Sequence, residues 1–251
     1  MKNPSYIISV GLICLAEILG PGSSAASWWE KGAGLFEKTE VQSGVQAISG
    51  PSVAEIDEAF KEALLIGSEN VVNKLGSIDG FNSDPSIHIP LPEELTIVKT
   101  MLSRIGMAQM VDDLELKLNR AAESATPKAK KLFIQSIKDM TFEDVKTIYK
   151  GADDSATRYF QRKMAPALHE EMQPIVDGSL SQVGAIQAYD SIMGRYQTLP
   201  LVPDVKANLT EHVIQRGMDG IFFYMAKEEA AIRKNPVKQT TVLLKKVFGT
   251  Q

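Results

Sequence analysis

Cysteine is almost absent from this sequence: the only one, Cys14, lies in an apolar stretch near the start of the chain. The rest of the chain therefore can form no disulfide within itself and offers no thiolate ligand to a zinc ion. Lipidation at Cys14 is not expected either. A lipoprotein signal has a small residue directly before the cysteine and usually a leucine three positions before it, whereas this sequence has Ile13 and Gly11 there.

Basic residues are in slight deficit, with 27 Lys and Arg against 31 Asp and Glu and a formal net charge of −4. Nucleic-acid binding requires a clustered basic surface, so nucleic acid is not expected as a partner. No segment alternates apolar and polar residues over the length of a β-strand. Hydrophobic residues make up 44% of the chain, which is typical of a folded globular protein with an apolar core.

The start of the chain has the pattern of a secretory signal peptide. Lys2 supplies a positive charge, an apolar stretch that includes Glu17 follows at 7–19, and a Gly-Pro-Gly turn leads to small residues at 23–26. The apolar stretch is shorter than the ~20 residues that a membrane span requires. We expect cleavage after Ala25 or Ala26 and a periplasmic protein; the alternative is an uncleaved anchor in the inner membrane.

Helix signals recur along the rest of the chain. Ser52 and Glu55 form a capping box before apolar residues at helical spacing, and Thr141 and Asp144 have the same relation. These signals predict an all-α fold, a compact bundle of about ten helices with one long ordered loop at 77–92. The expected helices begin near residues 53, 93, 107, 127, 142, 154, 166, 183, 204, 218 and 237.

The signal-peptide pattern and the helix signals together divide the chain into three segments. These are a signal peptide at 1–26, a tether or N-terminal segment at 27–51, and a single helical domain at 52–249. A weak internal duplication is one interpretation of the domain. Residues 90–107 and 200–218 both run from a proline-rich piece through an acidic cap and an amphipathic helix to Gly-Met. Chance is the better explanation of this similarity, because proline followed by an acidic residue is a common helix start.

The loop at 77–92 contains four potential ligand residues, Asp79, Asn82, Asp84 and His88, and the candidate binding residues among them are Asp79, Asp84 and His88. Their spacing is not that of a calcium-binding loop, and the simpler interpretation is that the Asp side chains bond to their own backbone in turns. Ile87, Ile89 and Leu91 alternate with His88 and prolines. We therefore expect the three aliphatic side chains to be buried in a groove between helices and His88 to face the opposite side, toward solvent or a cleft.

The helix expected over 112–123 carries charges on more than one side. Glu115 and Asn119 share one side of this helix. Its charges are expected to form internal ion pairs between neighbouring helices. The alternative is a polar binding pocket lined by Asp112, Asp113 and Arg120.

Six short segments of the sequence have a distinctive pattern. They lie at 79–82, 87–92, 112–123, 201–206, 228–236 and 244–249, and they read DGFN, IHIPLP, DDLELKLNRAAE, LVPDVK, EEAAIRKNP and LKKVFG. Through these segments the sequence resembles, over residues 52–249, a bacterial family known only as domain of unknown function 4197. The resemblance implies an exported helical protein, and it assigns no catalytic residue.

Sequence motifs of catalysis and of phosphate or dinucleotide binding are not found, and His169 lacks the second histidine of a His-Glu-x-x-His zinc motif. We therefore expect no metal and no cofactor, and a non-enzymatic binding or scaffold role in the cell envelope. The alternative is an enzyme or a metal-dependent site built on the 77–92 loop and the 112–123 helix. Trp28, Trp29 and the basic residues of 227–251 are candidates for contact with a membrane or envelope surface.

Overall fold

The computed structural model describes residues 52–149 and 151–234, and within these ranges the chain is all-helical with no strand. The all-α prediction is therefore confirmed. The expected signal at 1–26, the segment at 27–51 and the expected helix from residue 237 lie outside the described residues. The elements are α2 (Val53–Leu75), η1 (Glu93–Leu95), α3 (Thr96–Arg104), α4 (Ala108–Lys138), α5 (Phe142–Tyr149), α6 (Ser155–Gln182), α7 (Ala185–Gln197) and α8 (Leu209–Lys234).

Several expected helix boundaries are wrong, because prolines and glycines lie inside long helices. α4 continues through Pro127 and α6 continues through Pro166 and Pro174. A proline within a helix costs about 3 kcal/mol or more, but the apolar face of α4 is buried on both sides of Pro127, and that burial offsets the cost. The buried residues flanking the proline are Ala122, Ala125, Ala129 and Phe133.

α8 likewise passes through Gly217 and Met218 without a break, and it begins at Leu209 and not at Asp204. The structure does not confirm the internal duplication, since α3 has 9 residues and α8 has 26. The capping boxes are confirmed. Glu55 N–H donates to the Ser52 hydroxyl, and Asp144 N–H donates to the Thr141 hydroxyl, each at 3.2 Å.

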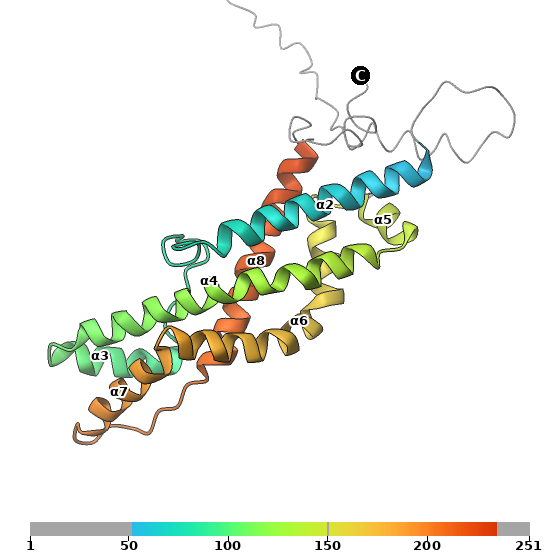
Figure 1. Ribbon diagram of the computed structural model, residues 1–251. Coiled ribbons are helices and arrows are strands. Elements are labelled where there is room, and N and C mark those ends of the chain that lie inside the picture. The colour runs from blue at the N-terminus through green and yellow to red at the C-terminus, as the bar shows by residue number, and fades with distance from the viewer. Residues whose placement is uncertain (1–51, 150, 235–251) are drawn as a thin grey trace, which may run out of the picture.

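α4 is the central helix of the bundle (Figure 1), and it packs against α2, α6, α7 and α8. The buried ring of Phe133 makes edge-to-face contacts with Phe160 of α6 and Phe222 of α8, at centroid distances of 6.2 and 6.5 Å. These three rings join the three longest helices of the described residues at one point of the core. The loop between α2 and η1, residues 76–92, lies over α4 and α8 and contains three of the six candidate residues, while the other three lie on α4.

Candidate functional site

The 76–92 loop is ordered first by its own turns. Gly80 N–H donates to the Ser77 carbonyl at 3.0 Å, and His88 N–H donates to the Asp84 carbonyl at 2.8 Å. Asp79 has a left-handed backbone, with φ 67°, a conformation that aspartate tolerates better than most residues. The Asp84 side chain accepts a hydrogen bond from Ser86 N–H at 2.9 Å, as expected for an Asx turn.

A buried carboxylate of α4, Glu123, holds the backbone of the loop. Its side chain is only 5% exposed. Oε1 accepts hydrogen bonds from the N–H groups of Phe81 and Asn82, both at 3.1 Å. Oε2 accepts from Arg120 at 2.7 Å. A buried carboxylate is tolerated when it is both hydrogen-bonded and paired with an opposite charge, and Glu123 meets both conditions.

Arg120 links this buried carboxylate to the surface of the loop. Its second terminal nitrogen donates to Asp79 Oδ1 at 2.8 Å, and Asn82 Nδ2 donates to the same oxygen at 2.9 Å. The hydrogen bonds from Asn82 and Arg120 lower the pKa of Asp79 below its ordinary value. The hydrogen bond to Glu123 in turn raises the pKa of Arg120. The guanidinium therefore bridges two carboxyl groups, one buried and one exposed.

A fully buried amide, Asn119 of α4, pairs with the peptide groups of Ile89 as a neighbouring strand would. Asn119 Oδ1 accepts from Ile89 N–H at 2.9 Å, and Asn119 Nδ2 donates to the Ile89 carbonyl at 2.8 Å. Buried backbone groups require hydrogen-bond partners. The extended segment around Ile89 can therefore enter the core, because Asn119 supplies the hydrogen-bond donor and acceptor that a neighbouring β-strand would otherwise supply.

His88 is held between the loop and α4 and does not point freely into solvent. Its side chain is 30% exposed. Nδ1 donates to the Asn82 carbonyl at 2.9 Å, and Nε2 lies 3.0 Å from Glu115 Oε1. Lys99 Nζ lies 3.3 Å from the other oxygen of Glu115. Burial raises the pKa of Glu115, but the hydrogen bond from His88 and the charge of Lys99 outweigh burial and leave that pKa below its ordinary value.

Buried apolar side chains hold the inner side of the loop against the helices. Ile87 and Ile89 are buried as expected, while Leu91 is partly buried. Phe81 is fully buried against Gly220 of α8, where a Cβ atom would lie 2.7 Å from the phenylalanine ring. The close approach of the loop to α8 therefore depends on a residue without a side chain.

The outer face of the loop forms an open depression of about 360 Å³. Tyr224 of α8 donates to Asp84 at its edge and lowers the pKa of this carboxyl group. The Lys74 ammonium lies 3.6 Å from the centre of the Tyr224 ring, a cation–π contact. Ile78 is 81% exposed. The depression is lined by Lys74, Ser77, Ile78, Asp79, Gly80, Ser83, Asp84 and Pro85.

The structure separates the six candidate residues into three groups. Asp79 and Asp84 lie on the outer face of the loop, and His88 and Arg120 connect the loop to α4. Asp112 and Asp113 are surface residues with other partners: Asp112 lies 3.8 Å from Lys99 and Asp113 lies 3.4 Å from Lys117.

Three of the residues that position the loop were not among the candidates. Glu115, Asn119 and Glu123 are spaced by four residues each and so share one face of α4. The signal available in the sequence was this polar row, of which the first two members were recognised as sharing a side. Tyr224 gave no signal, because an aromatic residue in an apolar helix is ordinarily part of the core.

Within residues 52–149 and 151–234, no group of three or more His, Cys, Asp or Glu residues is placed to hold a metal ion. The three histidines have separate partners: His88 contacts Glu115 at 3.0 Å, His169 contacts Glu211 at 2.8 Å and His212 contacts the Pro90 carbonyl at 2.8 Å. None of the helices in the described part of the chain is long and apolar enough to span a membrane.

Fold and site together define an all-helical protein in which an ordered loop is fastened to a central helix by a buried carboxylate and a buried amide. Sequence comparison identifies the particular family. Residues 50–249 match the family described as "Protein of unknown function (DUF4197)", and the chain belongs to this family. No curated protein and no solved structure matches the chain.

Proposed function

We propose that this protein is exported to the periplasm and has a non-enzymatic binding role in the cell envelope, with the outer face of the 77–85 loop as its contact surface. The observation that carries the proposal is the rigid presentation of Ile78. This aliphatic side chain is 81% exposed, yet it belongs to a loop whose backbone is bonded to a buried carboxylate. Ordering a residue costs about 1–2 kcal/mol, and a loop ordered before binding does not incur that cost on association.

The charges beside Ile78 indicate the chemistry of the partner. Asp79 and Asp84, on either side of the depression, both have lowered pKa values and are therefore ionised at neutral pH. A protein or peptide partner that places an apolar side chain on Ile78 and a basic residue near these carboxylates would match the surface. In this proposal Arg120 and His88 position the loop, while Asp112 and Asp113 do not contact the partner.

The proposal of export rests on Lys2, the apolar stretch at 7–19 and the small residues at 23–26. Fractionation of the native host followed by N-terminal sequencing should find the protein in the periplasm and beginning at Ala26 or Ser27. Recovery in the inner membrane with Met1 retained would support an uncleaved anchor instead, and a purely cytoplasmic protein would contradict export.

The binding role is tested with a photo-crosslinking amino acid placed at Ile78 in living cells. The matched control is Ile105, an exposed isoleucine at the C-terminal end of α3. We expect one envelope component to be crosslinked from position 78 and not from position 105, and we expect Asp84→Asn to weaken the product. Equal crosslinking from both positions, or none from position 78, would contradict the proposed contact surface.

A further inference from the structure

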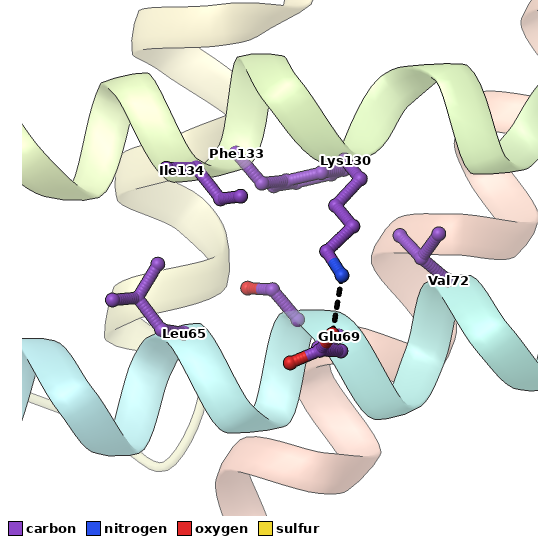
Figure 2. Close-up of a pocket in the computed structure, with 7 residues that line it drawn as sticks. Leu65, Glu69, Val72, Lys130, Phe133 and Ile134 are labelled. Atoms are coloured by element: carbon purple, nitrogen blue, oxygen red, sulfur yellow. Dashed lines mark hydrogen bonds and ion pairs between the residues drawn. The ribbon is translucent and has the colours of Figure 1, made fainter.

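A second surface feature lies on α2, along the stretch from Leu65 to Val72. It is a groove of about 250 Å³ between α2 and the C-terminal half of α4. Figure 2 shows Leu65 and Val72 on α2 facing Phe133 and Ile134 on α4, with an ion pair between Glu69 and Lys130 bridging the two helices. Ser68 completes the lining.

The groove is suited to a few aliphatic side chains. Its volume lies below the ~300–1,000 Å³ of most small-molecule sites. Its lining is mostly apolar, and Leu65 and Ile134 are only partly buried. Covering these side chains removes apolar surface from water, which favours the bound state.

The chain itself contains a segment whose apolar and charged residues match those of the groove and of α2. Residues 235–251 include an apolar set at helical spacing, Leu243, Leu244, Val247 and Phe248, and their basic residues are Lys238, Lys245 and Lys246, with no acidic residue. α2 has the opposite charge: five acidic residues against two lysines. Apolar pattern and charge therefore both complement the α2 side of the groove.

The position where α8 ends places this segment within reach. Lys74 contacts the Tyr224 ring and Asn70 bonds to Glu228, so α8 runs antiparallel to α2 toward the part of α2 that contains Leu65. α8 ends at Lys234, and its end emerges beyond α2 (Figure 1). Five extended residues span up to ~17 Å, which exceeds the ~10–12 Å diameter of a helix, so residues 235–239 are long enough to cross α2.

We propose that residues 240–248 bind in the groove between α2 and α4 of their own chain, with the apolar side of the segment against Leu65, Phe133 and Ile134. Asn235-Pro236 supplies the change of direction, because a residue before proline disfavours the helical conformation. The segment thereby covers the apolar groove, and Lys245 and Lys246 lie near the acidic residues of α2. This intramolecular contact is independent of the proposed loop surface at Ile78.

Disulfide trapping tests the contact, since the chain has no cysteine apart from Cys14. In a full-length Cys14→Ser background, Ser68→Cys is combined with a cysteine at Leu243, Leu244, Val247 or Phe248. The matched control replaces Ser68→Cys with Ser191→Cys, an exposed position on α7. We expect at least one Ser68→Cys pair to close within the monomer on mild oxidation, and no Ser191→Cys pair to do so.

A second measurement does not depend on disulfide geometry. Leu244→Glu in the full chain should open the groove and raise the fluorescence of a dye that binds exposed apolar surface several-fold, with unchanged far-UV circular dichroism. Thr250→Glu adds the same charge outside the apolar set and should leave the fluorescence unchanged.

Disulfide-linked dimers without an intramolecular product would show that a second copy fills the groove. Absence of any Ser68→Cys product together with binding of the segment to anionic vesicles would assign it to a membrane surface. Either result overturns the proposal, and neither bears on crosslinking at Ile78.

Discussion

Glu123 carries a negative charge into the interior of the protein, and its three hydrogen bonds explain why it is tolerated there. Two of the donors are backbone N–H groups of the loop, and the third is Arg120. Removal of the carboxylate leaves those donors without their partner, and the loss is larger than the net value of each bond. The residue is thus a positioning group for the loop and not a reactive one.

The first prediction concerns this residue. Glu123→Ala should lower the free energy of unfolding by about 3–5 kcal/mol, the usual effect of breaking a buried ion pair. Glu123→Gln, which keeps one acceptor oxygen, should lower it by about 1–3 kcal/mol. Urea denaturation measures both, with the exposed Glu143→Gln as a control expected to stay within about 0.5 kcal/mol of wild type. Equal stability of Glu123→Ala and wild type would show that the loop does not depend on this carboxylate.

The second prediction concerns the pH dependence that Glu115 confers. Its pKa is lower in the folded protein than its ordinary value of 4.5, so the carboxylate stabilises the fold above that value. This contribution is lost as pH falls through the folded-state pKa. The difference in stability between wild type and Glu115→Gln should therefore be largest near neutral pH and shrink below pH 4.5. Leu116→Ala, a neighbouring substitution without charge, should show a difference that does not vary with pH.

At the scale of the elements, α8 brings its glycines to two different environments. A Cβ at Gly220 would lie 2.7 Å from the Phe81 ring and 3.3 Å from Ile87, whereas a Cβ at Gly217 would meet nothing within 4 Å. The same substitution at two sites of one helix therefore separates the intrinsic helix propensity from the packing of the loop.

The third prediction uses this pair. Gly220→Ala should destabilise the protein by about 1–3 kcal/mol through overpacking, and it should increase hydrogen exchange at the N–H groups of Phe81 and Asn82. Gly217→Ala should stabilise it by about 0.4–1 kcal/mol, because alanine reduces the entropy of the unfolded chain. Thermal melts and amide exchange provide the two readouts. If both variants were stabilised, the loop would not be seated on α8 as described.

The elements also show which boundaries a sequence can predict. Ser52 with Glu55, and Thr141 with Asp144, predicted helix starts correctly because a capping box is a local interaction over three residues. Pro127 and Pro166 predicted breaks that do not occur. Local propensity favours a break at each proline, and the buried apolar face that continues past it depends on neighbours distant in sequence.

At the scale of the whole molecule, stability depends on the helical core and not on covalent cross-links. The last prediction follows: reducing agent should leave the melting temperature of the exported protein unchanged, and far-UV circular dichroism should show a helical protein with negligible sheet. Differential scanning fluorimetry with and without reductant provides the measurement. A melting temperature that falls on reduction would show that Cys14 is retained and forms a disulfide between chains, because it is the only cysteine in the sequence.

The sequence by itself determined the helical class, the capping boxes and the buried side of the 87–91 segment. Each of these depends on residue spacing within one element, which periodicity reports directly. Only the tertiary structure decided what Glu123 and Asn119 do, since their partners lie 42 and 30 residues away along the chain. It also decided that His88 contacts Glu115, and that Asp112 and Asp113 lie on the surface away from the loop. Long-range pairing depends on how helices pack, and a pattern within one helix does not identify its partner.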